Sequence, residues 1–137
     1  PVEAQLRRLA TELGLGNSVR MAPRQQDVAR WLRAIDIFVL CSDTESFPNA
    51  LLEAMACGCA VIGSRVGGVP ELVADGASGL LFDAGREDQL AHQIETLLRQ
   101  QDLRKQLGAE AARRAREEFS MQAVVSRMET LYERLLR

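Results

Sequence analysis

The sequence has few of the residues that build disulfide frameworks and metal sites. Three cysteines and one histidine, His92, are present among 137 residues. An odd number of cysteines in so short a chain argues against a disulfide framework and favours a reducing compartment, with the cytoplasm as the default. Cys57 and Cys59 form a C-x-C pair, but no further ligand stands near them except Cys41. We therefore expect small buried residues there, and no metal.

Long apolar runs and an excess of basic charge are also absent. No stretch reaches the roughly 20 apolar residues of a membrane span. The net charge of −2 gives no reason to expect nucleic acid as a partner. The basic run Arg113, Arg114 and Arg116 is expected to be a solvated helix face, with contact to anionic lipid as the alternative.

The chain does contain enough apolar sequence for a core, since 47% of its residues are hydrophobic. We therefore expect residues 1–137 to form a single α/β domain. Apolar runs between turn residues are typical of strands in a parallel sheet covered on both faces, and they stand at residues 19–22, 35–40, 60–64 and 79–82. Amphipathic patterns predict helices at residues 2–15, 28–34, 48–57, 69–74, 86–98, 103–119 and 121–136.

The stretch from Asp43 to Gly58 carries most of the chemistry. It lies between two predicted strands, with Pro48 placed where a helix can start and Gly58 where it can end. The N-terminus of this helix then stands at the carboxyl end of a parallel strand, which is where open α/β sheets bind ligands. The unpaired N–H groups of Ser46 to Leu51 offer a site for an anion, most naturally a phosphate.

Two carboxylates flank this predicted anion site. Glu45 lies in the loop before the helix and Glu53 on its second turn, where helical side chains lean back toward the N-terminus. Like charges repel, so neither carboxylate should bind the phosphate, and both are expected to accept hydrogen bonds from neighbouring hydroxyls. A ligand with phosphates in the middle and hydroxyl-rich groups at both ends is a nucleotide sugar.

The sequence around the two glutamates resembles that of a known family. Glu45 and Glu53 stand in E-S-F-P-N-A-L-L-E-A-M-A-C-G, followed by G-G-V-P-E-L-V at 67–73 and G-L-L-F at 79–82. Over residues 19–98 the chain resembles the C-terminal, donor-binding domain of retaining glycosyltransferases of the GT-B fold, group 1 (family 4). The resemblance implies a Rossmann-like parallel sheet with helices on both faces and a helical C-terminal segment. Relative to that fold we expect the first two strands and the acceptor-binding N-terminal domain to be absent.

The resemblance also assigns roles to residues. It implies that Glu45, as the catalytic residue, contacts the donor sugar and that Glu53 contacts the nucleotide ribose. The amides between them are implied to contact the sugar and the diphosphate. The implied donor-binding set is Glu45, Ser46, Phe47, Pro48, Asn49, Ala50, Leu51 and Glu53. The loop formed by Met21, Ala22, Pro23 and Arg24 is implied to lie near the base, although the family commonly has glycine where this chain has Ala22.

The charge of the segment bears on diphosphate binding. Residues 41–98 hold nine acidic and two basic residues, Arg65 and Arg86. In the family, an Arg and a Lys of the first strand–helix unit hold the diphosphate, and we expect that unit to precede Pro1. No Asp-x-Asp pair or His/Asp cluster stands near the motif, so we expect neither a metal nor another cofactor.

The implied function is that of a parent enzyme. It would transfer a sugar from a nucleotide donor to a hydroxyl of a glycan or lipid-linked acceptor, with retained anomeric configuration, and the fragment alone would be inactive. The expected location is the cytoplasm, with peripheral contact at the inner face of the membrane as an alternative. A non-catalytic α/β module that binds a nucleotide or a protein partner is the competing hypothesis. A nucleotide-sugar epimerase is disfavoured because G-G-V-P-E-L-V accompanies E-x7-E.

Three structural expectations accompany this interpretation. The helix near Pro48 should point its N-terminus into the principal cleft, with Glu45 and Glu53 on the rim. Gly67 and Gly68 allow a tight turn, whose role is either conformational or a ligand contact. Part of the apolar face of the last helix should lack a partner; that face comprises Val124, Val125, Met128, Leu131 and Leu135.

Overall fold

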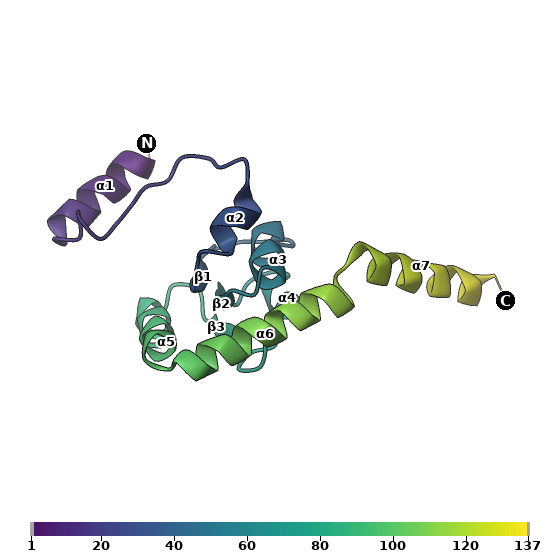
Figure 1. Cartoon of the computed structure of the whole chain (residues 1–137). Helices are drawn as coiled ribbons and strands as arrows, with labels where there is room; N and C mark the ends of the chain where they lie inside the picture. Colours follow the sequence, from purple (N-terminus) through teal and green to yellow (C-terminus); the bar gives the residue numbers. More distant parts are fainter. Residues whose placement is uncertain (1, 137) are drawn as a thin grey trace.

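A three-stranded parallel sheet forms the centre of the computed structural model, which describes residues 2–136 (Figure 1). Its strands are β1 (Ile37–Leu40), β2 (Ala60–Ser64) and β3 (Leu80–Phe82), in the spatial order β1-β2-β3. Every residue of β2 is buried, as expected for a strand with a neighbour on each side and helices above and below. The predicted parallel sheet is confirmed.

Helices cover both faces of the sheet. One face packs against α2 (Val28–Leu32), α3 (Asn49–Ala56) and α4 (Val69–Leu72). The other face packs against α5 (Glu87–Arg99), and α6 (Gln101–Glu118) contributes to both faces. The first face buries a cluster that includes Leu51, Met55, Val61 and Leu72, and the second buries Ile62, Phe82, Leu97 and Leu107.

Helix α6 passes close to the turn that precedes β2. A Cβ atom at Gly108 would lie 2.4 Å from the carbonyl oxygen of Gly58, so only glycine allows this approach. On one side of this crossing Leu107 enters the second cluster, and on the other side Ala111 enters the first. The helix therefore ties the two layers together at the amino end of the central strand.

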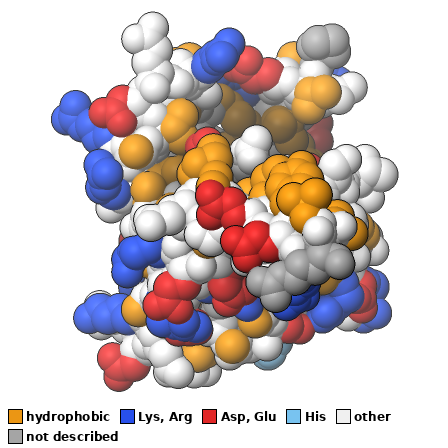
Figure 2. Space-filling view, turned by 90° about the vertical axis from the view of Figure 1, so that its right-hand side faces the viewer, with side chains coloured by type: hydrophobic (Ala, Val, Ile, Leu, Met, Phe, Trp, Pro, Cys, Tyr) orange, Lys and Arg blue, Asp and Glu red, His pale blue; other side chains and the backbone are white. Residues whose placement is uncertain are grey.

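The first and last helices lie away from this core. Neither α1 (Val2–Glu12) nor α7 (Met121–Leu135) contains a buried residue, and Figure 1 shows both extending from the body of the molecule. The hydroxyl oxygen of Ser120 caps α7 by accepting a hydrogen bond from the N–H of Ala123. Figure 2 views the face from which α7 extends, and hydrophobic side chains are exposed there. The expectation that the apolar face of this helix lacks a partner is confirmed for residues 2–136, where its large members are 37–72% exposed.

Residues 19–22 do not form the predicted strand. The N–H of Val19 donates to the carbonyl of Leu15 at 3.0 Å, and residues 19–22 have no regular secondary structure. A strand needs the hydrogen-bond ladder of a neighbour, and no strand within residues 2–136 lies beside it. The apolar run there was correctly identified, but its pairing partner was not available.

Two finer features of these elements stand out. In α2, Trp31 is 39% exposed while its neighbour Leu32 is buried. Consecutive helical residues point about 100° apart, so a helix as short as α2 turns only one of them inward. Strand β1 begins at Ile37 rather than Ile35, and its residues are half-buried because β2 is its only partner among the described residues.

Candidate functional site

The N-terminus of α3 has open backbone donors. Pro48 is the N-cap, with φ −80° and ψ 100°, and no side chain caps the helix. The N–H groups of Leu51 and Leu52 donate to the carbonyl of Pro48 at 3.1 and 3.2 Å. Those of Asn49 and Ala50 donate to no protein acceptor within residues 2–136, and both residues are exposed. Unsatisfied amides at a helix start bind anions, and the helix dipole adds partial positive charge.

The rest of α3 is firmly anchored. Leu51, Ala54 and Met55 are completely buried against the sheet. Gly58 ends the helix in the left-handed conformation at φ 82°, as predicted, and the N–H of Cys59 donates back to the carbonyl of Ala54 at 3.1 Å. The position of the helix N-terminus is therefore fixed by the core.

Glu45 is held by a short chain of hydrogen bonds. The hydroxyl of Ser42 donates to Glu45 Oε1 at 2.9 Å, and the hydroxyl of the buried Ser64 donates to the carbonyl of Ser42 at 2.7 Å. Neither serine was indicated as functional by the sequence. The one available signal was Ser64 itself, a hydroxyl at the end of an otherwise apolar buried strand.

The Gly67–Gly68 turn packs directly against the loop that carries Glu45. A Cβ atom at Gly67 would lie 1.5 Å from the carbonyl oxygen of Glu45, and one at Gly68 would lie 2.3 Å from that of Ser46. Gly67 has φ +49°, and the N–H of Gly68 donates to the Ser46 carbonyl at 3.0 Å. The structure thus shows a conformational role for both glycines, and a ligand contact by this turn stays a prediction.

Glu53 is exposed on the second turn of α3 and lines two hollows. One, of about 350 Å³, lies between α3 and α6, and the other, of about 520 Å³, lies between α3 and α2. Glu45 lines neither hollow, and the position of both glutamates on the rim of one principal cleft stays a prediction. Helices pack along the flanks of α3 and create hollows there, whereas its N-terminal residues Asn49 and Ala50 are exposed.

The loop predicted near the base adjoins one of these hollows. A cavity of about 740 Å³ is lined by Arg24, Gln25, Gln26, Asp27, Arg30, Trp31 and Ala34. Gln26 and Asp27 also line the 520 Å³ hollow that Glu53 reaches. Arg24 and Glu53 thus line two neighbouring cavities that share these two residues, whereas Met21, Ala22 and Pro23 line neither cavity.

Both arginines of the acidic segment are already engaged. Arg65 pairs with Asp75 at 2.7 Å and with Asp83 at 3.5 Å. The hydrogen bond that Arg65 donates to Asp75, together with the charges of both acids, raises the pKa of Arg65. Arg86 pairs with Asp88 at 2.7 Å, and its hydrogen bond lowers the pKa of Asp88 to about 2. Within residues 41–98 both basic side chains are thus paired with acids, whereas the amides of Asn49 and Ala50 are open to an anion.

The cysteines do not gather into a metal-binding cluster. In the described part of the chain, no group of three or more His, Cys, Asp or Glu residues is arranged to hold a metal ion. Cys41 is exposed, Cys57 is half-buried and Cys59 is buried, and burial raises the pKa of the Cys59 thiol. Among residues 2–136 no helix has both the length and the apolar character that crossing a membrane requires.

Comparison with known families gives one clear match. The sequence profile described as "Glycosyl transferases group 1" matches residues 1–114. The chain is 38% identical over 129 residues to the N-acetyl-alpha-D-glucosaminyl L-malate synthase of Bacillus anthracis, a match that covers 94% of this chain and 34% of that protein. The chain spans about a third of the length of the curated relatives it matches.

Solved structures agree with this match. A structure of Alr3699/HepE from Anabaena in complex with UDP has a TM-score of 0.88 and 29% identity, and covers 95% of this chain and 36% of that one. The same protein is also known in complex with UDP-glucose. The C-terminal domain of a glycosyl transferase group 1 family protein, LpcC from Francisella tularensis, has a TM-score of 0.78 and 26% identity, and covers 88% of this chain and 63% of that one.

Proposed function

The chain belongs to the glycosyl transferases group 1 family, and on that premise we propose that it is the part of a glycosyltransferase that binds the nucleotide-sugar donor. The parent enzyme would transfer the sugar to a hydroxyl of a glycan or lipid-linked acceptor with retained anomeric configuration. The acceptor would be held by an N-terminal domain, so residues 1–137 alone would not catalyse transfer.

One observation carries this proposal. The exposed, unsatisfied amides of Asn49 and Ala50 stand between Glu45 and Glu53 at the carboxyl end of β1. Amides hold phosphate oxygens, whereas carboxylates accept hydrogen bonds from sugar hydroxyls. This order of donors and acceptors along α3 fits a diphosphate that has a sugar on one side and a ribose on the other.

The orientation of the donor follows from the neighbouring cavities. Glu53 lines a hollow that shares Gln26 and Asp27 with the cavity lined by Arg24. We place the ribose at Glu53 and the base toward Arg24, which leaves the transferred sugar on the side of Glu45. The relative solved with UDP and UDP-glucose supports UDP as the first nucleotide to test.

The proposed role of Glu45 in the reaction is electrostatic. Departure of the nucleoside diphosphate leaves positive charge on the anomeric carbon and the ring oxygen of the sugar. A carboxylate bonded to the sugar stabilises that charge more strongly in the transition state than in the ground state. The amides of α3 stabilise the leaving diphosphate, so this account needs no metal.

Thermal-shift screening of the full-length protein against UDP, ADP and GDP tests the proposal. We expect one diphosphate to raise the melting temperature, and Glu53→Gln to reduce that rise. Glu129→Gln on the distant, exposed α7 is the matched control and should keep it. Stabilisation by a nucleotide without release of UDP from UDP-sugars in the presence of acceptor glycans would favour a non-catalytic binding module. No stabilisation by any of the three would contradict the proposal.

A further inference from the structure

We propose that Ser42 and Ser64 are positioning residues that fix the carboxylate of Glu45 toward the donor sugar. The inference rests on the function proposed above, because it assigns a task to Glu45. It goes further in naming two side chains that do not touch the donor themselves. The chain of contacts runs from the core strand β2 through the loop after β1 to Glu45.

The first contact starts in the core. Ser64 is 1% exposed and ends β2, and its hydroxyl donates to the carbonyl of Ser42 at 2.7 Å. A buried hydroxyl without a partner would cost free energy, so this bond fixes the rotamer of Ser64 and the path of the loop at the same time. The backbone of Ser42 is thereby tied to a residue 22 positions away in the sequence.

The second contact restrains the carboxylate of Glu45. Ser42 donates from its own hydroxyl to Glu45 Oε1 at 2.9 Å. Within residues 2–136, Glu45 Oε2 accepts no hydrogen bond from the protein, so it is available to a sugar hydroxyl. A carboxylate held at one oxygen has fewer rotamers to lose when the donor binds.

The glycine turn prevents the loop from relaxing away from this position. Gly67 approaches the carbonyl of Glu45 so closely that a Cβ atom would lie 1.5 Å away, and the N–H of Gly68 holds the Ser46 carbonyl. The backbone of Glu45 is therefore restrained on one side and its side chain on the other. Catalytic groups need such support, because a small misplacement removes a large part of their effect.

A pair of matched substitutions tests the role of Ser42 in the full-length protein. Thr and Val have nearly the same shape, but only Thr keeps the hydroxyl. We expect Ser42→Val to weaken binding of UDP-glucose and to slow release of UDP from it by about three- to tenfold, which is the effect of one hydrogen bond. Ser42→Thr should stay close to wild type, and both variants should bind UDP itself within about twofold of wild type, since UDP lacks the transferred sugar that Glu45 is proposed to contact.

A double substitution separates positioning from a general structural effect. If Ser42 acts through Glu45, the effect of Ser42→Val should disappear in a Glu45→Ala background, because interacting residues are not additive. Ser64→Val should likewise weaken UDP-glucose binding more than Ser64→Thr does, and this difference should also disappear in the Glu45→Ala background. Equal behaviour of Val and Thr at position 42, equal weakening of UDP and UDP-glucose, or a full effect in the Glu45→Ala background would each overturn the inference.

The positioning role and the proposed function fail in different ways in these experiments. If the wild-type protein binds none of UDP, ADP and GDP, the proposed function is contradicted together with the positioning role that depends on it. Normal binding by wild type with no difference between the Val and Thr variants contradicts the positioning role alone. Should Ser42→Val fail to fold, shown by loss of its melting transition, Ser42→Ala takes its place in the same comparison, and activity equal to wild type would again overturn the role.

Discussion

Glu45 and Glu53 belong to one sequence motif, but their surroundings differ. Glu45 is half-buried and accepts a hydrogen bond from Ser42, whereas Glu53 is exposed beside two hollows. In the proposed function Glu45 contacts the sugar, where charge develops during the reaction. Glu53 contacts the ribose, whose charge hardly changes. The two residues should therefore affect different steps.

Isosteric substitutions in the full-length protein should reveal this difference. We expect Glu45→Gln to lower kcat by more than about tenfold, roughly 1.4 kcal/mol of activation free energy, because transition-state stabilisation is lost. Glu53→Gln should chiefly raise the KM for the donor. Steady-state kinetics measures both, with melting temperatures as the control for folding. A Glu45→Gln variant that changes only KM, or a Glu53→Gln variant that loses kcat, would show that the roles are assigned wrongly.

A second residue-scale prediction concerns Gly67. Gly67→Ala should be destabilising because alanine at φ +49° costs about 1–2 kcal/mol and its Cβ would overlap the Glu45 carbonyl. Gly76→Ala is the matched control, since Gly76 has φ +76° but nothing within 4 Å of the added Cβ. Chemical denaturation should give the larger loss for Gly67→Ala. Equal losses would mean that the loop moves aside easily.

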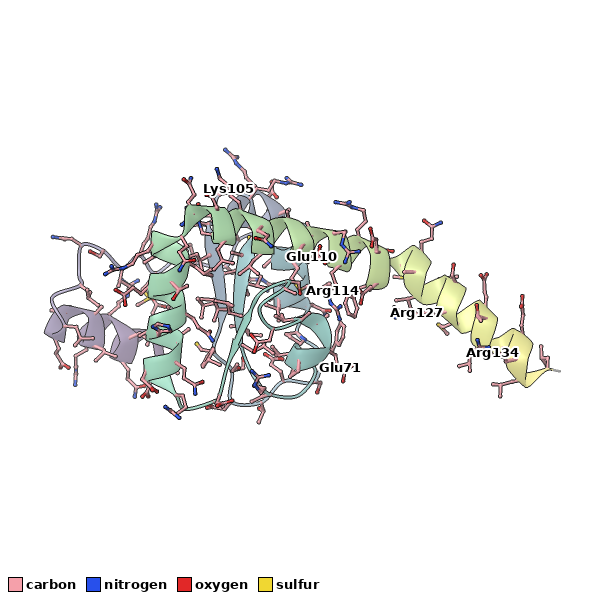
Figure 3. All side chains as sticks on the ribbon, turned by 90° about the horizontal axis from the view of Figure 1, so that it is seen from below. Glu71, Lys105, Glu110, Arg114, Arg127 and Arg134 are labelled. Carbon is pink, nitrogen blue, oxygen red and sulfur yellow. The ribbon has the colours of Figure 1, made fainter. Side chains whose placement is uncertain are left out.

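At the scale of secondary-structure elements, α6 contacts both α4 and the loop before α3, which lie beside the site. Arg114 on α6 donates to the carbonyls of Leu72 and Glu71 at 2.9 Å each, and Figure 3 shows Arg114 extending from α6 toward Glu71. Its guanidinium also lies 5.6 Å from the centre of the Phe119 ring, which contacts Phe47 of the motif. One side chain thus connects α6 with the end of α4 and with the loop before α3.

Arg114→Ala should therefore be costly. We expect a loss of about 2 kcal/mol in the free energy of unfolding, since the charged hydrogen bonds to the carbonyls of Leu72 and Glu71 are removed. Arg113→Ala, one residue away, removes only exposed ion pairs with Glu110 and Glu117 and should cost less. Denaturant titration compares the two variants. If Arg113→Ala proved as damaging as Arg114→Ala, the contacts to α4 would not be the stabilising ones.

Local signals explain which elements could be predicted. Strand β2 and the end of α3 at Gly58 were predicted because an apolar run and a glycine carry the information within a few residues. The strand at 19–22 was wrong because pairing depends on a distant partner. The Ser64–Ser42–Glu45 chain and the Arg114 contacts were not predicted for the same reason, since they join residues up to 43 positions apart.

For the whole molecule, the charge distribution decides how a diphosphate can be held. Residues 41–98 carry nine acidic and two basic residues, and both arginines are paired with acids. The family resemblance assigned donor-binding roles to the two glutamates, and these roles stay predictions. It did not predict the two hollows along the flanks of α3, because hollows depend on how helices pack.

This arrangement leads to a prediction about metal ions. Because backbone amides are proposed to hold the phosphates, a chelator should leave sugar transfer by the full-length protein nearly unchanged. Activity assays with and without EDTA, with added magnesium as the comparison, measure this directly. Complete loss of transfer with EDTA and its recovery with magnesium or manganese would mean that a metal bridges the diphosphate.

The proposed function depends above all on the N-terminus of α3 holding the diphosphate of the donor. A crystal structure of the full-length protein with UDP is the decisive test. We expect phosphate oxygens within about 2.7–3.2 Å of the amide nitrogens of Asn49 or Ala50, with ribose hydroxyls donating to Glu53. UDP bound with its phosphates away from this helix start, or with Glu53 facing the phosphates instead of the ribose, would contradict it.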